Sequence, residues 1–228
     1  MSIKIFVTGT DTNVGKTYFC CALSNALQQL GYSTLAIKPI SSGCIEINNK
    51  LFNDDALLLQ QASSHQLSYE KINPFAYQPA IAPHIAAQQL NYHLTVEDLN
   101  NALYDAFHYP VDICIIEGVG GFYVPLNDHD TVADFVMKNH FPVILIVGIK
   151  LGCLNHAILT AKALQFDGIS LLGWIANIID DTMLACNDNI SALKTHINAP
   201  CLGILSLNQV IETAMAKNIM QCIQTLIL

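Results

Sequence analysis

Short, nearly continuous runs of apolar residues alternate along this chain with segments whose apolar residues recur every three or four positions. Continuous apolar runs are typical of strands buried on both faces of a parallel sheet. They predict strands over residues 3–8, 34–37, 111–116, 142–147, 171–176 and 201–205. Helical spacing predicts helices over residues 18–30, 95–107, 131–138, 155–165 and 210–226. This alternation predicts a single-domain α/β fold over residues 1–228, with a doubly wound, mostly parallel sheet flanked by helices.

Two stretches interrupt the alternation. Residues 44–53 are polar and predict irregular structure, after which Asn53 and the two aspartates that follow it cap a short helix. Residues 75–87 form a long connection, and three prolines lie in or beside it, namely Pro74, Pro79 and Pro83. The next helix begins at Thr95, which forms a capping-box pattern with Asp98.

A glycine-containing loop follows the first predicted strand and precedes the first predicted helix. It reads Gly9-Thr10-Asp11-Thr12-Asn13-Val14-Gly15-Lys16-Thr17. In such an arrangement, loop N–H groups and the positive end of the helix hold phosphate oxygens. Lys16 would reach the β- and γ-phosphates, and the Thr17 hydroxyl would face Mg²⁺. The loop is one residue longer than the general motif G-x-x-x-x-G-K-[ST], so an ordinary strand-to-helix turn is the alternative.

Polar residues are scarce in this chain, yet they recur where the predicted strands end. Lys38 and Ser42 follow the second strand, and Glu117 ends the third beside a glycine-rich turn. Lys150 follows the fourth strand, and Asn177 follows the fifth. The carboxyl ends of parallel strands lie along one edge of the sheet, where ligands bind in open α/β folds. The sequence therefore predicts a single site at that edge.

Three oxygen-bearing side chains are candidate ligands of Mg²⁺, which prefers hard oxygen donors: Thr17, Asp55 and Glu117. Glu117 has the placement of a Walker B aspartate with a longer arm, and its alternative is a solvated carboxylate at a strand end. Asp55 has a helix cap as its alternative. Lys38 can neutralise a transferring phosphoryl group or bind an anionic substrate, and its alternative is an ordinary surface lysine.

Composition and charge limit the partners of this protein. Hydrophobic residues make up 52% of the chain and charged residues 12%, which suggests apolar surface that a second subunit covers. All ten basic residues are lysines, so no arginine is available to a phosphate. The net charge of −8 argues against nucleic acid as the main ligand.

The sequence also predicts a cytoplasmic protein. Its eight cysteines include no C-x-x-C pair and are expected to be reduced thiols, while the histidines form no zinc-binding pattern. Polar residues follow the first apolar run too soon for a signal peptide. The longest apolar runs, such as residues 141–149, are too short to cross a membrane.

Together these motifs resemble the dethiobiotin synthetase family, in which the extra residue of the phosphate loop is the norm. The resemblance extends over roughly residues 3–205, and its motifs are the phosphate loop, Lys38-Pro39 with Ser42-Gly43, Asp55-Ala56, Asn73-Pro74, Pro83-His84, Glu117–Gly121, Lys150–Ala157 and Trp174–Asn177. It implies a P-loop NTPase-like fold and a homodimer. It also implies an ATP- and Mg²⁺-dependent ligase of biotin biosynthesis, which converts 7,8-diaminopelargonic acid and CO₂ to dethiobiotin.

The resemblance also implies roles for individual residues. The catalytic residues would be Lys16, Lys38 and Thr12. The substrate-binding residues would be Ser42 and, from the neighbouring subunit, Gly152 and Asn155. ATP would be bound by Asn13, Val14, Gly15, Lys16, Thr17, Asp55, Glu117, Gly118, Val119, Gly120 and Asn177, with Asn177 at the adenine edge. Mg²⁺ would be held by Thr17, Asp55 and Glu117.

Three positions depart from the family pattern. Asn13 stands where many relatives carry an acidic residue, and Ile178 stands where a polar residue is common. Residues 205–207 replace a proline-containing turn that binds the base, so the sequence leaves the nucleotide preference open. Two other classes remain as alternatives: an amide-forming ligase such as the cobyrinic acid diamide synthases, and a nucleotide switch of the partitioning-ATPase type.

Overall fold

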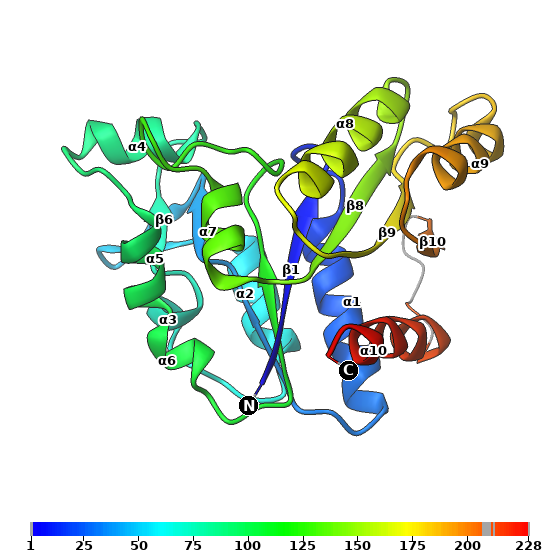
Figure 1. Cartoon of the computed structure of the whole chain (residues 1–228). Helices are drawn as coiled ribbons and strands as arrows, with labels where there is room; N and C mark the ends of the chain where they lie inside the picture. The colour runs from blue at the N-terminus through cyan, green and yellow to red at the C-terminus, as the bar shows by residue number, and fades with distance from the viewer. Residues whose placement is uncertain (1, 207–210, 212, 228) are drawn as a thin grey trace.

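The computed structural model describes residues 2–206, 211 and 213–227. Its centre is a six-stranded sheet in which neighbouring strands run parallel (Figure 1). The strands are β1 (Ile3–Gly9), β2 (Thr34–Ile37), β7 (Ile113–Glu117), β8 (Val143–Ile149), β9 (Leu171–Ile178) and β10 (Cys201–Leu205). Their spatial order is β10-β9-β8-β1-β7-β2, which places the first strand of the chain inside the sheet. The predicted doubly wound parallel sheet is confirmed.

Helices cover both faces of the sheet. One face carries α1 (Lys16–Gln29), α2 (Asp54–Ala62) and α10 (Thr213–Ile227). The other carries α5 (Val96–Ala102), α7 (Val132–Asn139), α8 (Cys153–Phe166) and α9 (Cys186–His196). Successive side chains of a strand point to opposite faces. In β1, Ile5 and Val7 accordingly join the core beneath α1, while Phe6 joins the core beneath α5 and α7.

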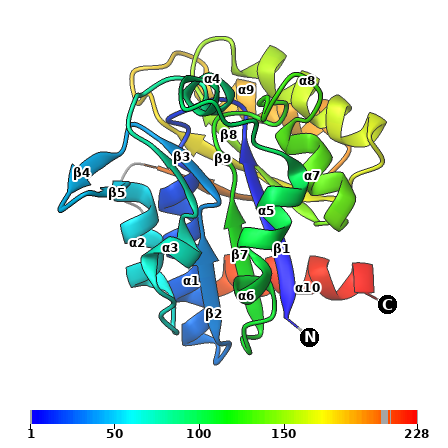
Figure 2. The same cartoon turned by 90° about the vertical axis from the view of Figure 1, so that its left-hand side faces the viewer.

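Smaller elements lie beside β2, which is an edge strand of the sheet. They are β3 (Ile40–Ser42), β4 (Ile45–Ile47), β5 (Lys50–Phe52), α3 (Tyr69–Ile72), β6 (Phe75–Tyr77), α4 (Pro83–Gln89) and α6 (Tyr104–Phe107). β3 pairs with β6 in parallel, and β4 with β5 in antiparallel. Figure 2 shows β2, β7 and β1 side by side, with the β4–β5 hairpin projecting next to them.

Several sequence predictions about this peripheral region were wrong. Residues 44–53 are not irregular, because β4 and β5 form a hairpin there; its turn residues Asn48 and Asn49 have positive φ angles of 52° and 59°, which asparagine tolerates. The connection over residues 75–87 contains β6 and α4. The helix predicted over residues 95–107 is divided into α5 and α6 at Leu103.

Other differences concern the ends of helices. Both α1 and α8 begin two residues before their predicted starts, and α9 was not predicted. The closing helix begins at Thr213 rather than residue 210, and residues 207–210 and 212 lie outside the described residues. None of the described helices is long and apolar enough to cross a membrane.

Candidate functional site

The phosphate loop joins the carboxyl end of β1 to the first turn of α1. Asn13 has φ 59° and Gly15 has φ 90°, so the backbone enters the left-handed region twice. Gly15 is the N-cap of α1, and a Cβ there would collide with the side-chain amide of Asn177. Position 15 therefore requires glycine for two reasons, the positive φ angle and the closeness of the Asn177 side chain. The turn leaves the N-terminus of α1 at the sheet edge, which suits an anion.

A cavity of about 780 Å³ lies beside this loop. It lies at the carboxyl ends of β1, β2 and β7, the edge at which open α/β sheets bind ligands. The lining includes both polar and apolar residues: Thr12, Asn13, Gly15, Lys16, Thr17, Lys38, Ser42, Asn53, Asp55, Ala80, Ile81, Ala82, Pro83, Glu117, Val119, Gly120, Gly121 and Val124. Segments distant in the sequence thus form one site at the predicted edge.

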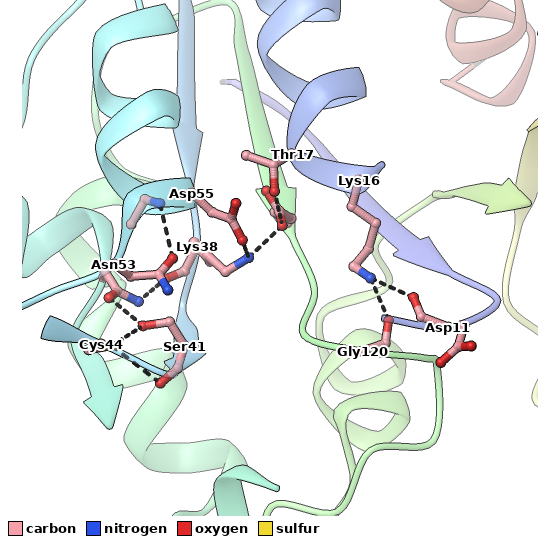
Figure 3. A network of polar contacts seen from close by, with 12 residues as sticks. Asp11, Lys16, Thr17, Lys38, Ser41, Cys44, Asn53, Asp55 and Gly120 are labelled. Atoms are coloured by element: carbon pink, nitrogen blue, oxygen red, sulfur yellow. Dashed lines mark hydrogen bonds and ion pairs between the residues drawn. The ribbon is translucent and has the colours of Figure 1, made fainter. Parts of the chain in front are cut away.

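Lys38 lies between two carboxylates in this cavity (Figure 3). Its Nζ is 2.6 Å from Glu117 Oε1 and 2.9 Å from Asp55 Oδ2, and the lysine is only 5% exposed. Burial by itself lowers the pKa of Lys38. The charges of Glu117 and Asp55 and their hydrogen bonds outweigh burial, so the pKa lies above its ordinary value. Lys38 is therefore a fixed, buried cation and not a surface lysine.

Glu117 is the most buried acidic residue of the site, at 1% exposure. Its Oε1 accepts hydrogen bonds from the Thr17 hydroxyl at 2.8 Å and from Lys38. Its Oε2 is buried and has no hydrogen-bond partner among the described residues. A buried oxygen of this kind calls for a ligand. The two carboxylates of Glu117 and Asp55 and the hydroxyl of Thr17 form a donor set that fits a hard divalent cation such as Mg²⁺.

Lys16 is directed toward a different part of the site. Its Nζ donates to the backbone carbonyls of Asp11, at 2.9 Å, and of Gly120, at 2.8 Å, so it links the phosphate loop to the turn after β7 (Figure 3). Burial lowers the pKa of Lys16 to about 8. A bound phosphate would raise this pKa again, since a nearby negative charge favours the ammonium form.

The remaining predicted residues divide into two groups. Thr12, Asn13, Ser42, Val119 and Gly120 line the cavity, and Ser42 Oγ is buried without a partner among the described residues. Four others do not line it, namely Val14, Gly118, Gly152 and Asn155. Val14 and Gly118 are buried in the walls of the site, whereas Gly152 and Asn155 are exposed.

Asn177 also lies outside the cavity lining, at the carboxyl end of β9. Its Nδ2 donates to the carbonyl of Val14 at 2.8 Å, and the residue is 7% exposed. It thus contacts the backbone of the phosphate loop directly, a contact that the sequence did not indicate.

Other contacts of the site were also missed from the sequence. Lys150 forms an ion pair with Asp11 at 2.9 Å, which joins the phosphate loop to the turn before α8. The hydrogen bond from Lys150 lowers the pKa of Asp11. Apolar lining residues such as Ile81 and Val124 carry no chemical signal in the sequence, although the Pro83-His84 motif marked one neighbouring segment.

Comparisons with known proteins agree with this geometry. The AAA_26 family, described as an AAA domain, matches residues 4–214. The septum site-determining protein MinD complexed with Mg-ADP from Pyrococcus horikoshii OT3 shares the fold at 16% identity, with a TM-score of 0.58 over 96% of this chain and 86% of that one. A ParA family ATPase from Chlorobium tepidum TLS does so at 18% identity and a TM-score of 0.53, over 97% and 89%. The fold and the site define a phosphate-loop nucleotide-binding protein.

Curated sequences narrow the class to one family. The ATP-dependent dethiobiotin synthetase BioD of Marinobacter nauticus is 45% identical over 92% of this chain and 90% of its own length. The protein of the same name from Cellvibrio japonicus is 43% identical over 88% of this chain and 87% of its own. The chain belongs to the ATP-dependent dethiobiotin synthetase family.

Proposed function

We propose that this protein is an ATP-dependent dethiobiotin synthase. It joins 7,8-diaminopelargonic acid and CO₂ into the ureido ring of dethiobiotin and releases ADP and phosphate. Family membership supports the reaction, and the relatives' names favour it over a cobyrinic acid-type ligase or a partitioning switch. The observation that carries the proposal is the buried Lys38 ammonium in the cavity beside the phosphate loop.

The chemistry needs an anion to be formed and then activated. One amine of the substrate is carboxylated to a carbamate, whose oxygen attacks the γ-phosphate to give a carbamic–phosphoric anhydride. The second amine then attacks the carbonyl carbon, expels phosphate and closes the ring. Negative charge develops on neighbouring oxygens in each step, and preorganised cations stabilise such charge.

Two lysines supply those cations, because the chain contains no arginine. Lys38 is already fixed in the cavity by its two carboxylates and faces the carbamate and the γ-phosphate in the proposed complex. Lys16 exchanges the carbonyls of Asp11 and Gly120 for phosphate oxygens. Thr12 and Ser42, which line the same cavity, orient the diamine and the carbamate.

Mg²⁺ completes the proposed site. Thr17, Asp55 and Glu117 would hold the ion, and the free Glu117 Oε2 supports this assignment. Bound Mg²⁺ would neutralise charge on the β- and γ-phosphates of ATP. Asn177, at the end of β9, would contact the base. Its neighbours Ile178 and Leu205 depart from the family pattern, so the preference for ATP over other nucleotides has to be measured.

The proposed active protein is a homodimer. The start of α8 is exposed at its N-cap, Gly152, and at Asn155 in its first turn, and it would enter the neighbouring subunit's site to bind the substrate carboxylate. Leu151, in the turn before α8, is 91% exposed, and Phe166, at the C-terminal end of α8, is 87% exposed. Large apolar side chains with this exposure support a face that a second subunit covers.

The test is a direct assay of the purified protein. With the diamine, bicarbonate and MgATP, it should release phosphate in proportion to dethiobiotin formed, and phosphate release should stop when the diamine is omitted. Phosphate release that does not depend on the diamine, in a protein that still binds ATP, would contradict the proposal. Replacing ATP by CTP or GTP in the same assay measures the nucleotide preference.

A further inference from the structure

Asn73 belongs to a motif, Asn73-Pro74, that the proposed mechanism leaves without a role. It follows α3 and precedes β6, and it is only 3% exposed. Its side chain does not line the cavity. Its hydrogen bonds nevertheless connect it to the backbone of Lys38 and, through Tyr69, to the N-cap of the helix that carries Asp55.

The first connection is to the backbone of Lys38. The ladder between β2 and β7 ends at Ile37, so the sheet does not hold the polar backbone groups of Lys38. The Lys38 N–H donates to the carbonyl of Ile72 at 3.0 Å, and the Lys38 carbonyl accepts from Asn73 Nδ2 at 2.6 Å. Two consecutive residues thus fix both backbone groups of the lysine, and Pro39 after it has no N–H of its own.

The second connection leads to the helix that carries Asp55. Asn73 Oδ1 accepts from the Tyr69 hydroxyl at 3.0 Å, and the same hydroxyl accepts from the Asn53 N–H at 2.7 Å. Asn53 is the N-cap of α2, and its side chain accepts from Ala56 N–H. Asp55 lies in the first turn of that helix.

Asn73 Oδ1 also accepts from the Ser41 hydroxyl at 2.7 Å, and Ser41 precedes the proposed substrate ligand Ser42. Figure 3 shows Ser41, Cys44 and Asn53 grouped on the far side of Lys38 from Thr17. One buried amide therefore joins the lysine, the cap of the helix bearing its partner, and the segment of Ser42.

We propose that Asn73 is the positioning residue of Lys38. It sets the place from which the flexible lysine side chain reaches the reacting oxygens, and it keeps that place in register with α2. The inference rests on the proposed role of Lys38 in synthesis. Small displacements of a catalytic group reduce rates strongly, by up to about a hundredfold for roughly 1 Å.

The first experiment compares Asn73→Ala with the wild type. The kcat for diamine-dependent phosphate release should fall about tenfold or more, while the dissociation constant of ATP changes less than about twofold, because the phosphate loop is untouched. Asn73→Asp keeps the size and the acceptor atoms but loses the donor to the Lys38 carbonyl, and it should show the same loss. This second variant covers the case in which Asn73→Ala does not fold.

Two control variants separate positioning from general loss of stability. Asn127 also donates its Nδ2 to a backbone carbonyl, that of Leu94 at 2.7 Å, away from the cavity. Asn127→Ala should lower the melting temperature while keeping kcat within about twofold. Ser41→Ala removes one hydrogen bond to Asn73 but retains the bond to Lys38, so its kcat should fall less than that of Asn73→Ala.

A readout independent of turnover is the ¹⁵N signal of the Lys38 ammonium in lysine-labelled protein, assigned by its loss in Lys38→Gln. The signal should shift or broaden in Asn73→Ala and remain in place in Asn127→Ala. An unchanged signal and an unchanged kcat in a folded Asn73 variant would overturn the inference. If the wild type makes no dethiobiotin, the proposed function fails, and the ammonium signal still decides whether Asn73 positions Lys38.

Discussion

At the scale of single residues, the site depends on a balance of buried charge. Lys38 and Glu117 are both almost fully buried and lie 2.6 Å apart. Removing one member of such a pair leaves the other charge uncompensated, whereas removing both costs much less. The pair therefore couples the stability of the protein to its proposed catalytic cation.

Lys38→Gln should abolish synthesis while nucleotide still binds, because the phosphate loop remains intact. The same change should lower the free energy of unfolding by about 3–5 kcal/mol, since Glu117 loses its cation. Adding Glu117→Gln should recover most of that stability but no turnover. Urea unfolding, ATP binding and phosphate release measure the three quantities. A double variant no more stable than Lys38→Gln would contradict the role given to the ion pair.

The exposed ion pair between Asp11 and Lys150 predicts a small dependence of stability on pH. Lys150 lowers the pKa of Asp11 in the folded state, so the stabilisation is complete above the ordinary pKa of 3.8 and is lost as the pH falls through the lowered value. Both side chains are about a third or more exposed, so the coupling should be less than about 1 kcal/mol at pH 7. A double-mutant cycle with Asp11→Asn and Lys150→Met, repeated from pH 7 to pH 2, measures it. Coupling that grows as the pH falls would contradict the expectation.

At the scale of elements, hydrogen bonds connect the phosphate loop to the segments at the carboxyl ends of two other strands. Lys16 ties it to the turn after β7, and Asn177 ties it to the end of β9. The loop conformation thus depends on segments far away in the sequence. These contacts hold the loop before any phosphate arrives.

Asn177→Ala should weaken the binding of inorganic tripolyphosphate as well as that of ATP, by about threefold or more. The reason is that Val14 loses the donor to its carbonyl, which is worth about 1 kcal/mol. A side chain that served only the base would leave tripolyphosphate affinity unchanged. Calorimetry with both ligands distinguishes the two cases, and Asn189→Ala, in an exposed part of α9, serves as a matched control.

The capping box of α5 supplies a second prediction for an element. The Thr95 hydroxyl accepts from the Asp98 N–H, and the Asp98 carboxylate accepts from the Thr95 N–H. Thr95→Ala should lower the free energy of unfolding by about 1 kcal/mol in urea titrations. Thr195→Ala, at an exposed position near the end of α9, should change it by less than about 0.5 kcal/mol.

How far the sequence predicted each element depended on burial. β2 and β10 were predicted with their observed bounds because their apolar runs are continuous. α9 was missed because only Ile190 and Leu193 of its residues are buried, which is too few for a helical stripe. The strands of the β4–β5 hairpin are short and mostly exposed, so their alternation gave little signal.

The sequence predicted the main residues of the site but not the contacts that support them. Its charged and glycine-rich motifs lie where strands end, so topology alone brought Lys16, Lys38 and Glu117 to one edge. The supporting contacts could not be predicted, because each joins positions far apart in the chain. The bond between Asn73 and Lys38 spans 35 residues, and that between Lys150 and Asp11 spans 139.

At the scale of the whole molecule, α8 presents exposed Leu159 and Phe166, and exposed Leu151 lies in the turn just before it. Leu159 and Phe166 are seven residues apart, which places them along one side of the helix. In the proposed homodimer, this side helps to bring the first turn of α8 to the neighbouring site. Sedimentation of the purified protein should therefore give a dimer, and Leu151→Asp with Phe166→Asp should give a monomer.

Shared sites predict complementation between inactive variants. Each mixed dimer of Lys38→Gln with Asn155→Ala would carry one site with both residues intact. Random pairing after co-expression should restore about a quarter of wild-type activity at limiting diamine, because half of the dimers are mixed and half of their sites are complete. Activity no higher than the sum of the two separate variants would place Asn155 in its own subunit's site or outside any site.

The strand order also governs when the protein can begin to fold during its synthesis. β1 and β2 are made first, but they do not pair with each other, because β7 lies between them. No two strands of the central sheet can join until the ribosome has delivered residues 113–117, and β1 gains its second neighbour only with β8. The phosphate loop lies near the start of the sequence, but it therefore takes its folded conformation late in synthesis. ATP can stabilise the nascent protein only after much of the chain has been made.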